Sequence, residues 1–330
     1  MDKGHNVFFI SDIIKNKFLR LLLNPIIIVF LTLKTNSQIV HLTSYVANPL
    51  LIKLFCTLTK KKYIVSLFCL YSSRYENFKK FSFYKKIKSP QIRKMYFFTI
   101  HEYLLLPCVD NLIMQSHGIA NSLPHYERYK HKIKVIPNAI EINHKFPKWL
   151  SKDISIKERP LNLLYAGGIE YSRGTDILIN TFNELCDKKV DAKLTLIGQM
   201  GDYFSEKLNF HEPNKVKLLS KLKREHFHRE VLKHDIFIYP SQNDGSPRVI
   251  LEMLSPGIPI FATNLPGIVG LDKKKEFINF ISDKESIIKK IEAYINDPSS
   301  FYLQSIKGRN HIRKYNSTKY VSKAYEKLYS

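Results

Sequence analysis

The sequence predicts an α/β protein made of two doubly wound domains, each with a mostly parallel sheet between helices. Three observations support this. Short apolar segments with strand character alternate with amphipathic helical segments along most of the chain. The predicted strands of the second half are nearly continuous apolar runs closed by glycine or polar turns, as in parallel sheets buried on both faces. A chain of 330 residues is also long enough for two domains.

The second half shows the alternation most clearly. We expect strands at 161–166, 192–197, 215–219, 235–239 and 259–262, and helices at 176–186, 225–233 and 247–254. In the helix at 176–186, apolar residues at 177, 178, 182 and 185 follow helical spacing. Ligands of such sheets bind at the carboxyl ends of the strands. Gly167, Gly198 and the segment 243–245 fall at these ends.

The first half is less regular but similar in kind. We expect strands at 7–10, 39–42, 63–68, 111–115 and 134–137, and helices at 50–59 and 93–105. The polar segment 141–160, with prolines at 147 and 160, fits an interdomain linker, and 309–328 is a helix candidate. We therefore expect domains at 1–144 and 145–308, followed by a terminal helix at 309–330.

The charge of the chain is concentrated in its first half. The net charge is +23, and residues 1–150 hold 23 basic and 7 acidic residues, against 29 and 22 in the rest. A basic half indicates an anionic partner, either nucleic acid or an acidic membrane surface, and the alternative is a lysine-rich solvated surface.

The cysteines and the N-terminus indicate a reducing cytoplasm. The four cysteines, Cys56, Cys69, Cys108 and Cys186, form no CxxC pair and have no metal-ligand spacing. The N-terminus does not resemble a signal peptide. The uncharged run 21–33 contains a proline and is too short for a spanning helix, so we expect none.

The segment 240–259 carries the strongest functional signal. An apolar strand is followed by Asp244 and Gly245, and a helix is expected to begin at Ser246 and Pro247, which are favoured at the N-cap and first helical positions. Arg248 lies beside this helix start and Glu252 lies on its second turn.

The chemistry of this segment fits a nucleotide sugar. A helix N-terminus suits phosphate, and ionised carboxylates accept hydrogen bonds from sugar hydroxyls. The alternatives are an ordinary Asp-Gly turn and a solvated glutamate. The histidines show no HExxH or HxxxH pattern, so we expect no metal.

These residues resemble a known family. The segments 165–176 (YAGGIEYSRGTD), 194–198, 234–241, 244–252 and 257–263, with Gly267, match the nucleotide-sugar domain of glycosyltransferase family 4 in order and spacing. The resemblance implies the GT-B fold, in which two Rossmann-like domains face a cleft. Domain 1–144 would bind the acceptor, domain 145–308 would bind the donor, and the terminal helix would return to the N-terminal domain.

The resemblance also implies roles for individual residues. Glu252 would hold the ribose hydroxyls, and Asp244 would face the donor sugar and stabilise oxocarbenium charge. Arg173 takes the place of the family's lysine against the leaving diphosphate. Backbone amides would hold the diphosphate, and the full set of donor residues is Gly167, Gly168, Arg173, Gly245, Ser246, Pro247, Arg248 and Glu252. Such enzymes transfer sugar with retention and without a bound metal or other cofactor.

The sequence departs from the family pattern at three places. It begins at the family's "GHxV" strand, Lys3–Val7, so we expect an N-terminal domain that lacks its first strand, glycine-rich loop and helix. Gly168 replaces an arginine, which leaves Arg173 to carry that charge alone. A histidine usual after the third strand is replaced by Cys69 or its neighbour.

The run 79–103, KKFSFYKKIKSPQIRKMYFFTIHEY, interleaves cations with aromatic residues. This composition is typical of an interfacial membrane segment and also of single-strand nucleic-acid binding, and the alternative is an exposed helix with a buried aromatic face. In the context of the resemblance we favour contact with the anionic inner leaflet, with a cytoplasmic, peripheral location and no nucleic-acid partner.

The resulting hypothesis is a retaining glycosyltransferase that moves sugar from a nucleoside-diphosphate sugar to a glycan or polyprenyl-linked acceptor. The resemblance and the charge suggest a role in surface polysaccharide synthesis, such as O-antigen, capsule or lipopolysaccharide. The alternatives are a non-catalytic relative that binds only donor or partner, a nucleic-acid-binding protein, and a GT-B sugar-nucleotide epimerase.

Overall fold

The computed structural model describes residues 17–43, 49–67, 103–123, 126–142, 159–201, 208–242 and 244–330. The chain forms two compact units, unit 1 with Met1–Ile136 and Tyr329, and unit 2 with Pro137–Leu328 and Ser330. The strand expected at 7–10, Cys69 and most of the segments 79–103 and 141–160 lie outside the described residues.

The division falls after Ile136, whereas the sequence placed it after residue 144. Hydrogen bonds explain the difference. Ile140 N donates to Asn316 O at 2.9 Å, and Asn316 Nδ2 donates to Asn138 O at 3.0 Å. Ile140 is 3% exposed and belongs to the core of unit 2. Residues 138 and 140 are therefore bonded to unit 2 before the polar stretch expected to be the linker.

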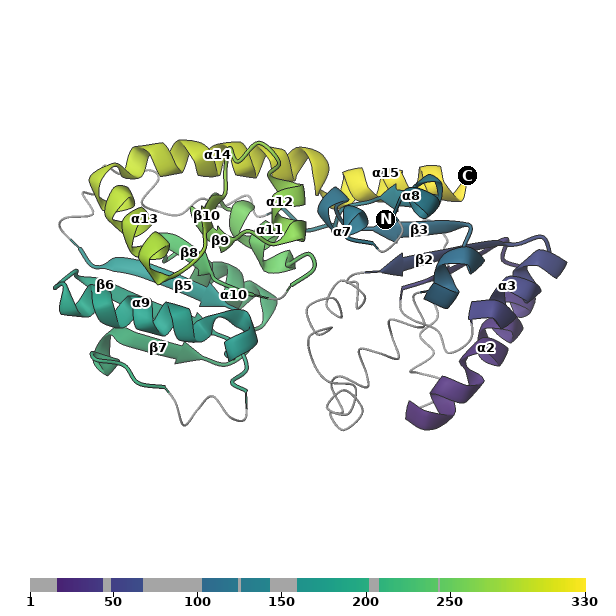
Figure 1. Ribbon diagram of the computed structural model, residues 1–330, viewed down its shortest axis with the longest axis horizontal. Helices are drawn as coiled ribbons and strands as arrows, with labels where there is room; N and C mark the ends of the chain where they lie inside the picture. The colour runs from purple at the N-terminus through teal and green to yellow at the C-terminus, as the bar shows by residue number, and fades with distance from the viewer. Residues whose placement is uncertain are drawn as a thin grey trace. The chain divides into compact units, whose positions relative to one another are not determined.

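Unit 1 contains a four-stranded parallel sheet in the order β1-β2-β3-β4 (Figure 1). The strands are β1 (Ile39–Leu42), β2 (Lys62–Leu67), β3 (Asn111–Met114) and β4 (Ile133–Val135). The described helices are α2 (Lys17–Lys34), α3 (Pro49–Leu58), α7 (His117–Asn121), α8 (Tyr126–Tyr129) and the 3₁₀ turn η1 (Lys130–Lys132). The four strands match the expected positions to within two residues.

Helix α2 was not expected from the sequence. Its apolar residues occur on every side and Pro25 lies inside it, so the segment shows neither a clean amphipathic stripe nor an uninterrupted run. Among its side chains from residue 23 onward, which are the ones that the structure describes, Pro25, Ile28 and Thr32 are buried. In the part of the chain that the structure describes, no helix has both the length and the apolar character needed to cross a membrane.

Unit 2 contains a six-stranded parallel sheet in the order β10-β9-β8-β5-β6-β7. The strands are β5 (Leu161–Ala166), β6 (Ala192–Ile197), β7 (Val216–Leu219), β8 (Ile236–Tyr239), β9 (Ile260–Thr263) and β10 (Asn279–Ile281). Chain order runs one way from β5 and the other way from β8, so these adjacent strands form a topological switch point. The carboxyl ends of strands at such a point are where ligands bind.

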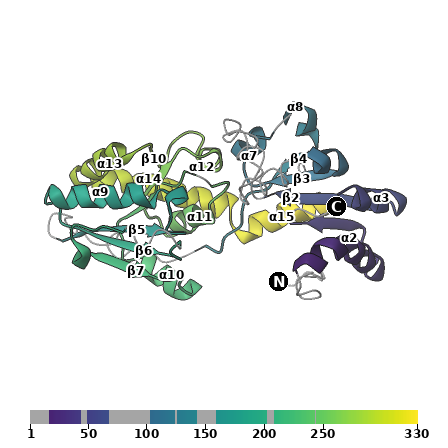
Figure 2. The ribbon, with the colours of Figure 1, turned by 60° about the horizontal axis from the view of Figure 1, so that its bottom comes forward.

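Helices surround this sheet, and Figures 1 and 2 show α9 and α13 side by side against it. These helices are α9 (Thr175–Asp187), α10 (Arg224–Val231), α11 (Arg248–Leu254), α12 (Pro266–Leu271), α13 (Lys284–Asn296) and α14 (Pro298–Tyr315), with 3₁₀ turns η4 (Tyr171–Arg173) and η6 (Pro213–Lys215). The last helix of the chain is α15 (Thr318–Tyr329). The single helix expected at 309–328 is wrong, because α14 ends at Tyr315 and Ser317 caps a new helix by accepting a bond from Tyr320 N.

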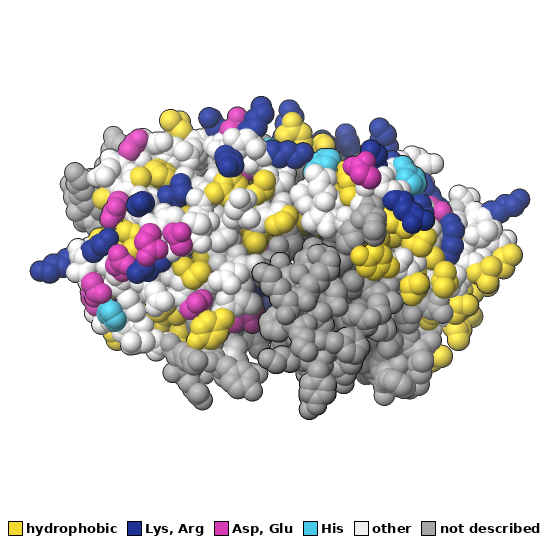
Figure 3. Space-filling model, in the orientation of Figure 1, with side chains coloured by type: hydrophobic (Ala, Val, Ile, Leu, Met, Phe, Trp, Pro, Cys, Tyr) yellow, Lys and Arg dark blue, Asp and Glu magenta, His cyan; other side chains and the backbone are white. Residues whose placement is uncertain are grey.

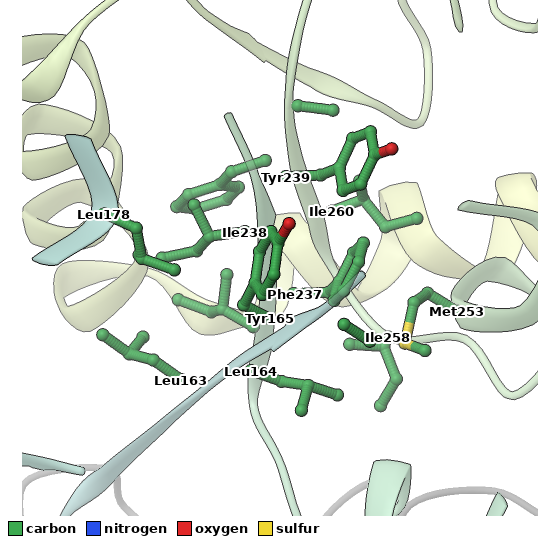
Figure 4. Close-up of a cluster of buried hydrophobic side chains, with 14 of the residues drawn as sticks. Leu163, Leu164, Tyr165, Leu178, Phe237, Ile238, Tyr239, Met253, Ile258 and Ile260 are labelled. Atoms are coloured by element: carbon green, nitrogen blue, oxygen red, sulfur yellow. The ribbon is translucent and has the colours of Figure 1, made fainter. Parts of the chain in front are cut away.

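The core of unit 2 explains why β5 and β8 are its central strands. Leu163, Leu164 and Tyr165 of β5 are each 0% exposed, and the residues of β8 are at most 2% exposed. Figure 4 shows the labelled side chains of both strands on either side of the sheet, with Leu178, Met253 and Ile258 packed against them. Strands buried on both faces read as unbroken apolar runs, which is why the sequence located them.

His41 on β1 is held between two hydroxyls in unit 1. Its Nε2 lies 2.8 Å from Ser66 Oγ, and its Nδ1 is hydrogen-bonded to the hydroxyl of Tyr329. Burial lowers the pKa of His41 to about 4. The imidazole is therefore neutral at physiological pH and accepts one of these bonds, a structural role that links β1 to β2.

We predict a pH-dependent contribution of His41 to stability. Its folded pKa of about 4 lies below its unfolded value of 6.5, so acidification protonates the unfolded state first. The contribution of His41 to the free energy of unfolding is complete above pH 6.5 and decreases as pH falls toward 4. The loss amounts to roughly 1–2 kcal/mol by pH 5. Urea series with pulsed hydrogen exchange of β1 and β2 peptides should show the stability gap between wild type and His41→Gln shrinking from pH 7.5 to pH 5. A gap that stays constant would contradict this assignment.

Candidate functional site

Two loops meet at the switch point of unit 2. One follows β5 and contains Gly167, Gly168 and η4, and the other follows β8 and leads into α11. Gly174 has a left-handed φ of 66°, and a Cβ there would lie 2.0 Å from the carbonyl oxygen of Pro240. The turn after η4 thus packs directly on the backbone after β8, and only glycine fits at this contact.

Arg173 and Asp244 join these loops through an ion pair. Arg173 Nη1 pairs with Asp244 Oδ2 and also donates to the Tyr239 hydroxyl at 3.2 Å. The Tyr239 hydroxyl donates to the same Oδ2 at 2.6 Å. On the other side, Arg173 Nε lies 3.8 Å from Glu170 Oε1. The sequence assigned Arg173 and Asp244 to separate groups of a ligand, whereas here they contact each other.

The protonation of this cluster follows from its burial. Burial raises the pKa of the Tyr239 hydroxyl, and the charge of Asp244 raises it further, so the hydroxyl remains a donor. Burial alone would lower the pKa of Arg173, but Tyr239 and Asp244 more than compensate and the pKa is raised. Arg173 is therefore a fixed cation. Tyr239 is a site residue that the sequence analysis missed, although a tyrosine that ends a buried strand just before this loop was a usable signal.

Tyr165 supports the other loop. Its hydroxyl donates to the carbonyl oxygen of Gly168 at 2.6 Å, and burial raises its pKa to about 12. Its ring stacks on Tyr239, with centroids 6.3 Å apart and planes 14° apart. Figure 4 shows these two rings on neighbouring strands. A Cβ at Gly168 would meet nothing closer than 3.7 Å, so this position has room for a side chain.

Glu252 on α11 is the second carboxylate of the motif, and it is half-buried. Burial raises its pKa, while Arg248 and Arg224 act in the opposite direction. Across the described ranges, no hydrogen bond or ion pair joins its carboxylate to another residue. A half-buried carboxylate without a protein partner is costly, and hydrogen-bond donors of a ligand would stabilise it.

The start of α11 differs from the sequence prediction. Ser246 was expected to cap the helix, but Pro247 occupies the N-cap position and no side chain caps the helix. Ser246 instead binds Asn138, whose Nδ2 donates to Ser246 Oγ at 3.2 Å and to Ser246 O at 3.3 Å. No side chain therefore satisfies the first amides of α11, and the positive end of its dipole suits an anion.

The segment Pro137–Ile142 thus borders the loop before α11, within unit 2. Besides the contact of Asn138, the exposed Arg248 donates from Nη2 to Ala139 O at 3.3 Å. No feature of the sequence indicated a role for Asn138 at the site. Its spacing of more than a hundred residues from Ser246 carries no local signal, so only the fold could reveal this contact.

The loop after β8 is also held by a backbone contact. A Cβ at Gly267 of α12 would lie 1.6 Å from the carbonyl oxygen of Gly245. Within the described residues, no group of three or more His, Cys, Asp or Glu side chains could hold a metal ion. The site therefore combines a helix start without a side-chain cap, a fixed cation, and two carboxylates on adjacent elements. This chemistry suits a phosphate group linked to a hydroxyl-rich group.

Comparison with protein families shows which family contains this sequence. The family model for glycosyl transferases group 1 matches residues 148–318, which is more than half of the chain. The chain belongs to the glycosyl transferases group 1 family. The matched region contains every residue that the sequence proposed for the site.

Curated relatives of this group 1 protein are distant. The capsular polysaccharide biosynthesis glycosyltransferase CapM of Staphylococcus aureus is 23% identical over 255 residues, which cover 72% of this chain and 66% of CapM. The chain thus spans just under two thirds of CapM, and half or less of three further relatives, two of them uncharacterized glycosyltransferases.

Solved structures show the fold of the group 1 chain. Sucrose-phosphate synthase from Thermosynechococcus elongatus aligns with a TM-score of 0.70 and 14% identity over 96% of this chain and 78% of that chain. HepE from Anabaena, in complex with UDP and glucose, aligns with a TM-score of 0.67 and 16% identity, and the alignment covers 92% of this chain and 81% of HepE. These likenesses confirm the α/β GT-B fold class expected from the sequence.

We predict that Gly267→Ala destabilises unit 2. Alanine favours a helix by about 1 kcal/mol over glycine, but its Cβ would collide with the Gly245 carbonyl. We expect a net loss of roughly 1–3 kcal/mol, because the loop before α11 must move. Thermal unfolding measures this effect. Gly201→Ala is the matched control, since a Cβ there meets its nearest neighbour at 3.5 Å, and equal melting temperatures for both variants would refute the backbone contact.

Proposed function

We propose that this protein is a retaining glycosyltransferase that takes its sugar from a nucleoside-diphosphate donor bound at the two loops of unit 2. One observation carries the proposal. Glu252 is a half-buried carboxylate without a protein partner among the described residues, and it lies on a helix whose N-terminus has no side-chain cap. Family membership and the UDP present in the HepE structure support the same donor class.

In this proposal Glu252 accepts hydrogen bonds from the two ribose hydroxyls. A ribose presents two adjacent donors, which match the two oxygens of a carboxylate. The diphosphate lies against the amides of Gly245–Arg248, where the dipole of α11 favours negative charge. Arg248 is exposed beside this helix start and adds a cation. Gly167 and Gly168 lie in the opposite loop, where the absence of side chains lets the backbone approach phosphate oxygens.

The pair of Arg173 and Asp244 gives the site two charge states. Without donor, Asp244 compensates Arg173. We infer that a bound diphosphate competes for the guanidinium and weakens this ion pair. Asp244, still held by Tyr239, would then face the donor sugar and stabilise the positive charge that develops at the anomeric carbon, while Arg173 stabilises the charge of the departing diphosphate. The sugar–phosphate bond breaks, the acceptor hydroxyl forms the new bond on the same face, and its proton passes to the oxygen of the departing diphosphate.

The proposed reaction uses no bound metal or other cofactor. Arg173, Arg248 and the helix dipole supply the positive charge that a divalent cation provides in other transferases. We therefore expect chelators to leave donor binding unchanged.

We propose that the acceptor is a glycan or a polyprenyl-linked glycan of a surface polysaccharide, such as O-antigen, capsule or lipopolysaccharide. The likeness to the capsular polysaccharide enzyme CapM supports this class of product. The net charge of +23 supports a location at the anionic cytoplasmic face of the membrane. A relative that binds donor without transferring sugar is the second candidate, which Gly168 favours because the family's arginine is missing there.

We predict that Glu252→Gln weakens binding of a nucleoside diphosphate about 10–100-fold, because charge-assisted hydrogen bonds contribute roughly 1.5–3 kcal/mol. Calorimetric titration with UDP and with GDP measures the change. Glu292→Gln, at an exposed glutamate of α13, is the control and should bind like wild type. If neither nucleotide binds the wild type, there is no donor site; if the two variants bind alike, Glu252 does not hold the ribose.

We predict opposite effects for the two partners of the ion pair. Arg173→Gln should weaken diphosphate binding, because it removes the cation. Asp244→Asn should bind diphosphate as tightly as wild type or more so, because it frees Arg173, yet lose about 10²–10³-fold in turnover. Calorimetry and the slow hydrolysis of the bound nucleotide sugar separate the two effects. Weaker diphosphate binding by Asp244→Asn would argue against the exchange, and absence of any turnover in the wild type would favour the non-catalytic candidate.

A further inference from the structure

Two helices of unit 1 carry large apolar side chains on their solvent side. On α2 and α3 these side chains are between 37% and 75% exposed. They are Leu23, Ile26, Phe30, Leu33, Leu50, Leu51, Leu54 and Leu58, and together they are named here the α2–α3 face. Exposed apolar residues occur singly on most proteins, whereas a contiguous set of this size marks an interaction surface.

The α2–α3 face is distinct from the side that packs on the core. On α2, Pro25, Ile28 and Thr32 are buried, and successive helical residues are 100° apart, so Ile26 and Phe30 lie on nearly the opposite side. On α3 the buried positions are Pro49, Ile52 and Cys56. The two helices pack against each other, which makes their exposed stripes one surface. Figure 3 shows hydrophobic side chains gathered where Figure 1 places α2 and α3.

The segment of sequence that forms this face carries charge of one sign, and Asp110, which precedes β3, is paired with Lys53 of α3 at 2.6 Å. No Asp or Glu occurs between Asp12 and Glu76, while nine Lys and Arg do. Lys34 and Lys60 are exposed at the ends of α2 and α3. An apolar surface in a segment rich in lysine and without acidic residues fits a binding partner that has an apolar interior and an anionic boundary.

We propose that the α2–α3 face docks on an anionic lipid bilayer. The apolar side chains would enter the boundary between headgroups and acyl chains, and the lysines would stay at the level of the phosphates. A second copy of this chain would bring the same positive charge against the face, so charge favours lipid over self-association. The inference rests on the proposed function for the biological role of the membrane, but the docking itself needs no donor.

Vesicle flotation tests the proposal. Wild type should float with vesicles of equal parts phosphatidylcholine and phosphatidylglycerol, and far less with phosphatidylcholine alone. Ile26→Gln with Phe30→Gln, and separately Leu54→Gln with Leu58→Gln, should weaken binding about tenfold or more. Lys34→Gln with Lys60→Asn should weaken it about fivefold for each lysine and reduce its dependence on salt.

Matched changes elsewhere are the controls. Leu303→Gln with Ile306→Gln removes two exposed apolar residues from α14, and Lys273→Gln with Lys274→Gln removes exposed charge from unit 2. Both control pairs should bind vesicles nearly as wild type, and melting temperatures check that all variants fold.

Three outcomes would overturn the proposal. These are a wild type that does not float, face variants that float like the wild type, and a dimer that the face variants dissociate without any vesicle binding. Calorimetry with UDP and GDP is independent of vesicles, so a failed donor site and a failed docking face remain distinguishable.

Discussion

The ion pair between Arg173 and Asp244 is the interaction on which the candidate site depends. It joins the loop after β5 to the loop after β8, and the Tyr239 hydroxyl fixes the orientation of the Asp244 carboxylate by donating a hydrogen bond to it. The pair forms only because β5 and β8 are neighbours at the point where strand order reverses. Glu252 is then the carboxylate of the motif that has no protein partner in the described ranges. In the absence of ligand, Asp244 therefore has a structural role, while Glu252 is available to bind a ligand.

The sequence was sufficient for the parts of the fold in which burial and pattern agree. Strands β5, β6 and β8 are buried on both faces, so their apolar runs located them to within one residue. Helix α2 was not predicted, because it is apolar on both its core side and its solvent side and such a pattern has no single period. The break between α14 and α15 was not predicted, because it is fixed by a hydrogen bond from Asn316 to Asn138. Local sequence patterns carry no information about such a long-range contact.

The candidate site divides in the same way. The spacing of the motif gave Asp244 and Glu252, since both lie on one short loop and helix. It did not give the partner of Asp244, because a carboxylate is equally compatible with a cation, a tyrosine or a ligand. Ser246 shows the limit of propensity: serine is favoured at an N-cap, but the amide of Asn138 binds its hydroxyl and the cap position shifts to Pro247. Tertiary contacts overrode a local preference of about 1 kcal/mol.

The approach of Gly267 to Gly245 constrains how this protein can evolve. The contact joins two backbones, so no compensating side-chain replacement elsewhere can restore it once a Cβ is added. Substitution of Gly267 is therefore excluded whatever ligand the loop binds. Gly168 lies in the facing loop, where an added Cβ would make only ordinary contact with the Glu170 side chain, at 3.7 Å or more. New ligand preferences can arise there by single substitutions, while the frame that presents the ligand stays unchanged.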